Sequence, residues 1–176
     1  MHIIIQQETE QDHTTVFKLI EEAFKKEKYS DKKEQFLVER LRKSEAFIPD
    51  LSLLAKYQDE IIGYILLTKI KIRNEEQTFE SLALAPVCVA PKFQGKRIGE
   101  KLIQKAHSIA KELGYESVVL LGHQDYYPRF GYKPAHTFRI KLPFDVPKEN
   151  VMAIELKENA LQNVSGIVEY PKAFGI

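Results

Sequence analysis

Residues Val87–Gly99 read V-C-V-A-P-K-F-Q-G-K-R-I-G. An apolar strand runs into Pro91, a short polar loop with Gly95 follows, and the apolar spacing predicts that a helix begins at Arg97 or Ile98. A junction of strand, loop and helix N-terminus directs unpaired backbone N–H groups and the positive end of the helix dipole at one point. This is a general way of binding phosphate, so the segment predicts a phosphate site.

Spacing excludes two common phosphate-binding motifs. A nucleotide P-loop needs a glycine five residues before its Gly-Lys pair and a Ser or Thr after it. Here Ala90 stands five residues before Gly95-Lys96, and Arg97 follows the pair. The dinucleotide fingerprint G-x-G-x-x-G also fails, because position 97 is not glycine.

The segment resembles motif A of the GNAT N-acetyltransferases, [Q/R]-x-x-G-x-[G/A] after a V-x-P strand end. Val89–Pro91 supplies the strand end, and Gln94, Gly95, Ile98 and Gly99 fit the usual wording. The sequence departs from the pattern at position 97, where an arginine replaces the usual glycine. An ordinary strand-to-helix turn is the alternative interpretation.

The resemblance implies acetyl-CoA as cosubstrate, with its pyrophosphate on this loop, and no metal. In the family the strand before the loop splays from its neighbour, and its free backbone N–H groups receive the pantetheine arm and the acetyl carbonyl. Cys88 alternates to the other face of that strand and reads as a small core residue. Lys101 joins the loop cations that could meet the nucleotide phosphates, with ordinary surface charge as the alternative. The implied coenzyme A contacts are Val87, Cys88, Val89, Gln94, Gly95, Lys96, Arg97, Ile98 and Gly99.

A second stretch, Asp125–Tyr132, reads D-Y-Y-P-R-F-G-Y. In the GNAT pattern a tyrosine stands four residues before the glycine of a terminal G-F or G-Y pair, and Tyr127 keeps that spacing to Gly131. The resemblance implies that Tyr127 protonates the departing thiolate. A modest downward shift from its usual pKa of ~10 would match it to a thiol of ~8.5. A packed ring with its hydroxyl on a carbonyl is the alternative, and Tyr126 is expected to pack.

The sequence does not single out the base that deprotonates the amine. Glu80, Glu27 and His123 are candidates, and deprotonation through ordered water is an equal alternative. The charged segment Lys25–Tyr29 is a weaker candidate for acceptor contacts, because in the family the segment joining the first two helices covers the acceptor site. His107 falls on the polar side of the helix after the loop, so it is expected to be solvated.

Length and composition limit what can be expected of domain number, binding partners and cellular location. The 176 residues fit one domain, and 26 Lys and Arg against 25 Asp and Glu leave a net charge of +1. This balance gives no reason to expect nucleic acid or an anionic membrane as partner. Cys88 is the only cysteine, the apolar run Leu82–Pro91 is shorter than the ~20 residues of a membrane span, and no signal peptide follows Met1. A cytoplasmic protein is expected, and a homodimer is left open.

Periodicity predicts the elements around the two motifs. Strands are expected at 3–5, 51–57, 61–72, 78–89 and 117–121. Helices are expected over the teens and early twenties with Thr9 and Asp12 as caps, after a cap at Ser30 or Asp31, and from the loop to Gly114. The three central strands form an antiparallel run in which Pro86 causes a bulge or splay.

A helix between strands 78–89 and 117–121 indicates a parallel pair joined by a right-handed crossover. The fold expected is therefore α/β, the GNAT fold: a mixed, mostly antiparallel sheet with a splayed parallel strand pair flanked by helices. Residues 1–176 are expected to form a single GNAT domain, with 136–176 as a strand-rich C-terminal extension of it.

The function expected is transfer of an acetyl group from acetyl-CoA to a primary amine by direct attack. The acceptor is a small-molecule or peptide amine, and acetylation of protein N-termini or lysines is one form it could take. The alternative of another class is a non-catalytic acyl-CoA-binding sensor or interaction module. Both functions use the same loop at Gln94–Gly99, so only turnover separates them.

Overall fold

The computed structural model describes all residues 1–176 and consists of three α-helices, nine strands and short 3-10 helices. None of the three α-helices is both long and apolar enough to cross a membrane. The helices are α1 (His13–Phe24), α2 (Glu34–Arg42) and α3 (Ile98–Glu112). The strands are β1 (Ile4–Gln7), β2 (Ser52–Tyr57), β3 (Glu60–Arg73), β4 (Thr78–Val89), β5 (Ser117–Leu121), β6 (Lys133–Pro134), β7 (Ile140–Lys141), β8 (Val151–Glu155) and β9 (Gly166–Glu169).

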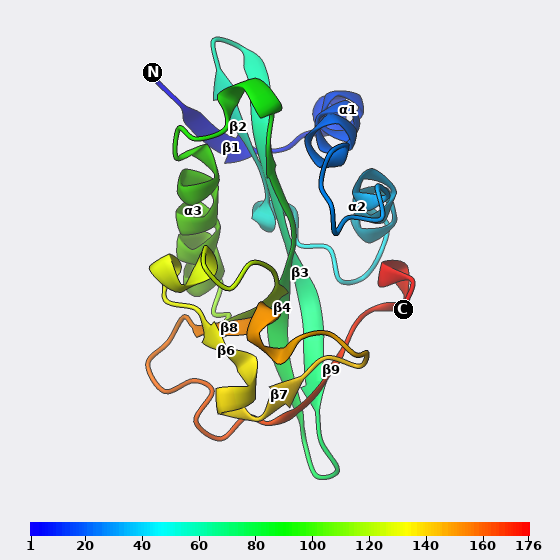
Figure 1. Ribbon diagram of the computed structural model, residues 1–176, viewed down its shortest axis with the longest axis vertical. Coiled ribbons are helices and arrows are strands. Elements are labelled where there is room, and N and C mark those ends of the chain that lie inside the picture. Colours follow the sequence, from blue (N-terminus) through cyan, green and yellow to red (C-terminus); the bar gives the residue numbers. More distant parts are fainter.

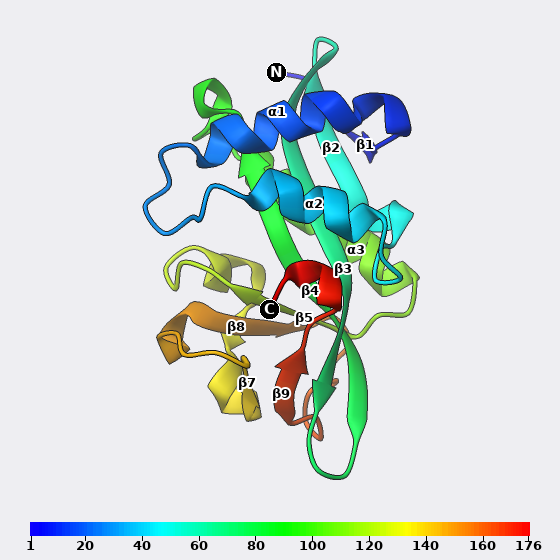
Figure 2. The same ribbon diagram turned by 90° about the vertical axis from the view of Figure 1, so that its right-hand side faces the viewer.

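The nine strands form one mixed sheet. Its order is β1-β2-β3-β4-β5-β8-β6, and β9 pairs with both β3 and β7. Strands β1 to β4 are antiparallel, whereas β4 and β5 are parallel. Helix α3 covers one face, and α1 and α2 lie side by side on the other (Figures 1 and 2). The predicted mixed sheet with a parallel pair is thus confirmed.

Local chemistry explains most element boundaries. The β2–β3 hairpin turns through Gln58 and Asp59, both at positive φ, and residues with short polar side chains or no Cβ are the usual choice there. The N–H and hydroxyl of Thr9 both donate to the Asp12 carboxylate, so the predicted cap pair is confirmed. The predicted caps of α2 are wrong, because Lys33 is the N-cap residue and makes no side-chain cap.

Helix α3 packs against β3 at a glycine. A Cβ on Gly63 would lie 3.0 Å from Leu102 Cδ1 and 3.2 Å from Ile98 Cγ2. The absence of a side chain therefore allows the start of α3 to approach the sheet closely. The buried face of α3 consists of Ile98, Leu102, Ile103, Ala106 and Ala110, whereas its C-cap residue Leu113 is 45% exposed.

A buried polar network joins α2 to the sheet. Arg42 donates two hydrogen bonds to the carboxylate of Glu8, which is itself 7% exposed. The hydroxyl of Ser52 donates to Glu8 Oε1 at 2.6 Å and lies 2.6 Å from the hydroxyl of Tyr64. The Glu8 carboxylate thus accepts three hydrogen bonds, and such additional bonds are the condition under which buried charges are tolerated.

The C-terminal residues add a second packed region at the other end of β3 and β4. Eleven buried residues from β3, β4, β5 and the chain after residue 134 form a separate apolar cluster. The last 3-10 helix, Lys172–Phe174, then returns to α2, where Arg40 Nε donates to the Ala173 carbonyl at 2.8 Å. The segment thus closes the sheet edge beside β3 and contacts the helical layer (Figure 2).

We predict that Gly63→Val lowers the free energy of unfolding by about 1–3 kcal/mol, because the new side chain overpacks the contact with α3. Equilibrium urea unfolding measures this loss. The matched control is Lys71→Val, which places the same side chain on an exposed position of the same strand, where a change within about 0.5 kcal/mol is expected. Equal stability of the Gly63 variant and the wild type would contradict the close helix contact.

Candidate functional site

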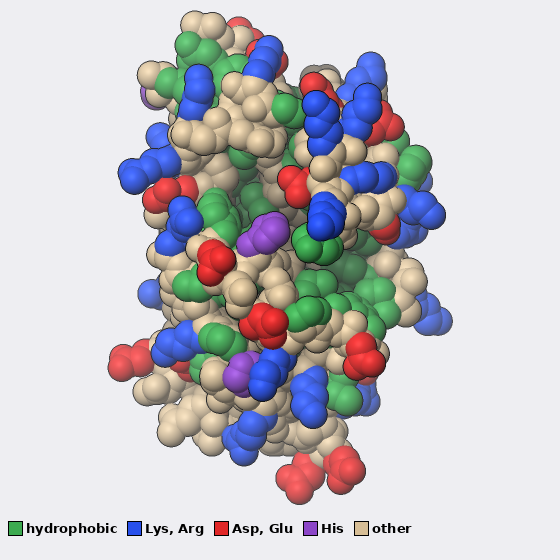
Figure 3. Space-filling model, in the orientation of Figure 1, with side chains coloured by type: hydrophobic (Ala, Val, Ile, Leu, Met, Phe, Trp, Pro, Cys, Tyr) green, Lys and Arg blue, Asp and Glu red, His purple; other side chains and the backbone are tan.

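A cleft of about 860 Å³ opens where β4 ends and α3 begins. Five segments line it: the end of α1, the end of β4, the loop before α3, the first turn of α3, and the 3-10 helix Tyr127–Phe130 with Tyr126 before it. Figure 3 shows the molecule from the side on which this surface is hollowed. The lining residues are Ala23, Phe24, Glu27, Val87, Cys88, Val89, Phe93, Gln94, Gly95, Arg97, Ile98, Gly99, Glu100, Tyr126, Tyr127 and Arg129.

The cleft exists because β4 and β5 separate. They pair only at Leu82 with Val118 and at Ala83 with Val119. On the other side of β4 the register with β3 shifts across Ala85 and Pro86, so the predicted irregularity at Pro86 is confirmed. Beyond it β4 continues to pair with β3 but has no partner on the β5 side.

Backbone alternation then orients the last residues of β4. Ala90 N–H donates to the Ile62 carbonyl at 2.8 Å, which makes Ala90 and Ile62 a hydrogen-bonded pair across β3 and β4. Because N–H groups of an antiparallel strand alternate in direction, those of Val87 and Val89 point away from β3, toward the cleft. The carbonyl of Val89 accepts a hydrogen bond from Gln94 Nε2 at 3.1 Å.

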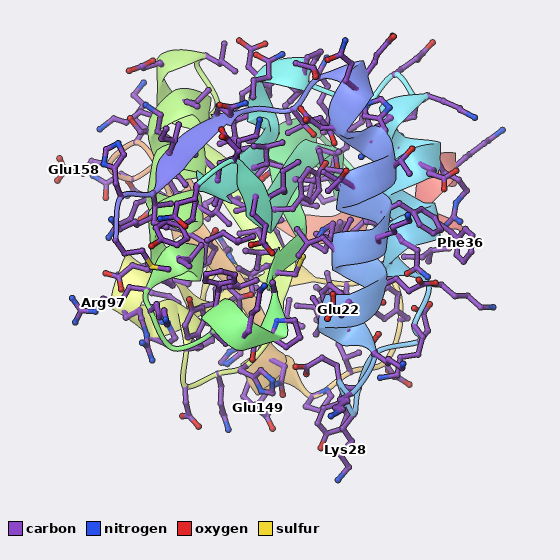
Figure 4. All side chains as sticks on the ribbon, turned by 90° about the horizontal axis from the view of Figure 1, so that it is seen from above. Glu22, Lys28, Phe36, Arg97, Glu149 and Glu158 are labelled. Carbon is purple, nitrogen blue, oxygen red and sulfur yellow. The ribbon has the colours of Figure 1, made fainter.

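The loop between β4 and α3 contains two left-handed residues. Gly95 has φ +78°, and Arg97, the N-cap of α3, has φ +63°. An arginine therefore stands in a conformation that favours glycine, which explains why the motif usually has glycine at this position. The Arg97 side chain is 83% exposed, comes within 3.8 Å of Glu100, and projects outward beside the start of α3 (Figure 4).

The structure brings together most of the predicted coenzyme A contacts. Eight of the nine residues line the cleft, and the exception is Lys96, whose Nζ lies over the ring of Phe93 at 5.8 Å. Cys88 is buried as predicted, and burial, with the nearby Glu34 charge, raises the pKa of its thiol to about 12. A thiol so raised does not supply the thiolate that nucleophilic catalysis needs.

Tyr127 lines the cleft from the 3-10 helix that follows β5. Its ring packs against Tyr126, Phe130 and Tyr132, and a Cβ on Gly122 would collide with it at 2.4 Å. Its hydroxyl makes no hydrogen bond within the protein, so the expected alternative of a bond to a carbonyl is not observed. Burial raises the pKa of Tyr127 to about 12, so the predicted downward shift is wrong.

Tyr126 contributes more than packing. The Arg129 guanidinium lies over its ring at 4.5 Å, and Arg129 Nε donates to its carbonyl at 2.8 Å. The Tyr126 hydroxyl comes within 3.3 Å of where a Cβ on Gly99 would be. A side chain at Gly99 would therefore crowd the side of the cleft where α3 begins. Sequence analysis predicts only packing for Tyr126 and does not indicate Arg129.

His107 is not solvated, contrary to prediction. Its Nε2 lies 2.7 Å from the hydroxyl of buried Tyr132, and the two rings are 5.4 Å apart. Burial lowers the pKa of His107 to about 4, so the ring is neutral at pH 7. The bond ties α3 to the residue that packs on Tyr127.

The candidate bases are not brought together. Glu27 lines the cleft at the end of α1. Glu80 instead borders a separate cavity of about 430 Å³ with Ser81 and Tyr115. His123 follows β5 and does not line the cleft.

Three comparisons with known proteins agree with this geometry. Residues 5–135 match the family model described as an acetyltransferase (GNAT) domain. Over 119 residues the chain is 36% identical to the uncharacterized N-acetyltransferase YjhQ of Escherichia coli K12, covering 67% of this chain and 66%, just under two thirds, of that relative.

Solved structures extend the likeness along the whole chain. The GNAT family N-acetyltransferase YhbS of Escherichia coli, crystallised with CoA, superposes with a TM-score of 0.89 at 24% identity, covering 100% of this chain and 93% of that one. A GNAT family acetyltransferase from Brucella melitensis, crystallised with acetyl-CoA, gives a TM-score of 0.81 at 29% identity, covering 98% of both chains.

We predict a pH-dependent stability that depends on His107. The folded pKa is about 4 against the usual 6.5, so between these values only the unfolded chain binds the proton and stability falls as the pH falls. The wild type should lose about 3 kcal/mol more than His107→Gln between pH 7 and pH 4. Urea unfolding at several pH values measures both proteins. Parallel stability curves would contradict a buried neutral imidazole.

Proposed function

The chain belongs to the GNAT acetyltransferase family, and from this premise we propose that it transfers the acetyl group of acetyl-CoA to a primary amine by direct attack. The observation that carries the proposal is the end of β4, where the N–H groups of Val87 and Val89 face the cleft without a partner strand. Unpaired backbone N–H groups of this kind can donate hydrogen bonds to the extended arm of acetyl-CoA.

The donor would lie across the loop and the first turn of α3. Gly95 has no atom within 4 Å of the position of a Cβ, so the backbone there can be approached closely. The N-terminus of a fifteen-residue helix adds its dipole. Arg97 and Arg129 are the cleft cations suited to phosphate groups. The residues present therefore fit coenzyme A.

Direct attack follows from the chemistry of the cleft. The acceptor amine loses a proton, adds to the thioester carbonyl and forms a tetrahedral oxyanion, which a backbone N–H at the end of β4 stabilises. The intermediate collapses to the amide as the C–S bond breaks. Cys88 takes no part as a nucleophile, because its thiol is buried and its pKa is raised to about 12.

Tyr127 is suited to meet the departing sulfur. Its hydroxyl has no protein partner and lies in the cleft wall, and its pKa of about 12 keeps it protonated across the neutral range. A tyrosine of this pKa is a weaker acid than a thiol, so it acts by donating a hydrogen bond to the sulfur as negative charge develops there. The proton that finally stays on coenzyme A balances the one released by the amine.

The acceptor would approach from the side of α1. Ala23, Phe24 and Glu27 form that wall, opposite Tyr127. Lys28 projects from the segment that follows α1 (Figure 4). Of the candidate bases only Glu27 lines the cleft, so it is the one that can reach an amine there without rearrangement.

We expect acetyl-CoA to stabilise the folded protein by roughly 2.7 kcal/mol at a concentration one hundred times its Kd. Gly95→Pro should abolish this shift in melting temperature, because proline lacks the N–H and cannot adopt the φ of +78° found there. Gly95→Asn is the matched control, since asparagine keeps the N–H and tolerates positive φ. Loss of the shift in both variants, or in neither, would argue against a backbone cradle.

We expect Tyr127→Phe to lower kcat by about 10²- to 10³-fold with little change in acetyl-CoA affinity, because the ring is kept and only the hydroxyl that donates a hydrogen bond to the sulfur is lost. Steady-state kinetics with an amine found by screening small amines and peptides provides the measurement.

Tyr126→Phe is the control for this experiment. It removes a neighbouring hydroxyl that faces Gly99 at the start of α3, so it should affect donor binding more than kcat. Full activity of the Tyr127 variant would contradict a hydrogen bond from its hydroxyl to the departing sulfur.

A further inference from the structure

The ring of Tyr127 lies directly against the backbone of Gly122. A Cβ built on Gly122 would collide with Cε2 of that ring and lie 3.1 Å from its Cδ2, whereas the next neighbour, Leu120 Cδ1, is 3.3 Å away. Gly122 does not have the positive φ that five other glycines of the chain adopt, so its backbone conformation is compatible with a side chain. The missing side chain therefore makes room for the ring of Tyr127.

Asn150 holds the backbone of Gly122 through two hydrogen bonds. β5 and β8 pair as far as Leu121 with Val151, which places Gly122 opposite Asn150. Gly122 N–H donates to the Asn150 carbonyl at 2.9 Å. The Asn150 N–H does not return this bond, because it donates to the Pro147 carbonyl at 3.0 Å. Asn150 Nδ2 donates to the Gly122 carbonyl at 3.0 Å instead, so a side-chain amide replaces a backbone N–H in the last pair of the ladder.

The side chain of Asn150 is suited to this bond. The Gly122 carbonyl accepts no other hydrogen bond within the protein, so it depends on this donor. An ionised aspartate of the same size offers only acceptors, and an alanine offers neither donor nor acceptor. Loss of the amide would therefore release one of the two bonds that fix the backbone against which the ring of Tyr127 rests.

The place of the Tyr127 hydroxyl depends on what supports its ring, because the hydroxyl makes no hydrogen bond within the protein. One support is the ring of Tyr132, whose centroid is 5.8 Å from that of Tyr127 and whose hydroxyl lies 2.7 Å from His107 Nε2. Another is the backbone of Gly122, which Asn150 holds. A group that acts on a reacting atom must be held to within about 0.5 Å of its productive place. Each support is therefore a means of setting the rate.

We propose that Asn150 is a positioning residue for acetyl transfer: it holds the backbone of Gly122 so that the Tyr127 hydroxyl stands where the departing sulfur develops charge. The inference rests on the proposed function, which supplies the role of Tyr127. Asn150 does not line the cleft, and it lies beyond residues 5–135 that match the family model. The C-terminal extension thereby contributes to catalysis through the residue that precedes β8.

A double-mutant cycle on kcat tests this role. Asn150→Ala should lower kcat about 10-fold or more and leave KM for acetyl-CoA within about 2-fold, because misplacement of a reacting group by ~1 Å can cost ~10²-fold in rate while the loop before α3 is untouched. In a Tyr127→Phe background the same change should alter kcat by less than about 2-fold, because the hydroxyl that it positions is already absent. Equal losses in the two backgrounds would overturn the inference and leave Asn150 a purely structural role.

The matched control is Asn163→Ala, which removes an exposed asparagine from the same C-terminal extension and should keep the wild-type kcat. Should Asn150→Ala not fold, Gly122→Ala serves as the second variant. Its new Cβ pushes the ring of Tyr127 aside while Asn150 stays in place, so kcat should again fall with little change in KM for acetyl-CoA. An unchanged kcat in Gly122→Ala would overturn the inference.

NMR spectra of protein carrying ¹³C in its tyrosine rings give a readout that needs no turnover. The signals of Tyr127 are those that disappear in Tyr127→Phe. Asn150→Ala should shift them, whereas Asn163→Ala should leave them in place. Unshifted Tyr127 signals in Asn150→Ala would overturn the inference. Failure of the wild type to acetylate any acceptor would instead overturn the proposed function, and the shift would still decide whether Asn150 holds the ring.

Discussion

The site depends on how few residues join β4 to β5. Two paired positions on each strand hold the parallel pair together, and beyond Pro86 the β5 side of β4 has no partner. A sheet normally satisfies its backbone groups within its own ladders. Here β3 holds one side of Val87 and Val89 firmly, while the other side is left open to the cleft, so the donors are both rigid and available.

Rigidity of these donors matters for chemistry. Hydrogen-bond donors that are already oriented lose no free energy to reorganisation when negative charge develops on the substrate. The register of β3 and β4, the packing of α3 on Gly63 and the left-handed residues Gly95 and Arg97 all fix the backbone at this point. On the opposite wall, Tyr132 and His107 fix the ring of Tyr127 through packing and one hydrogen bond.

The sequence predicted the parts of the site that local chemistry determines. The loop from Gln94 to Gly99, the start of α3 and the place of Tyr127 follow from short motifs, and the structure brings these segments to one cleft. The hydrogen bond and the lowered pKa of His107 could not be predicted from the sequence, because its partner Tyr132 lies 25 residues away. Helical periodicity alone places His107 on the side of the helix that faces water. The raised pKa of Tyr127 likewise results from burial under neighbouring rings, which no motif describes.

The buried network of α2 escaped prediction for a related reason: Glu8 and Arg42 are 34 residues apart, and charged side chains are normally exposed. Arg42 at the C-terminal end of α2 is bound to Glu8 on the sheet side, and Ser52 and Tyr64 complete that network. Removing one partner of such a buried pair is strongly destabilising, so α2 cannot shift freely on the sheet. The network thereby holds α2 at a fixed place on the sheet, although none of its members lines the cleft.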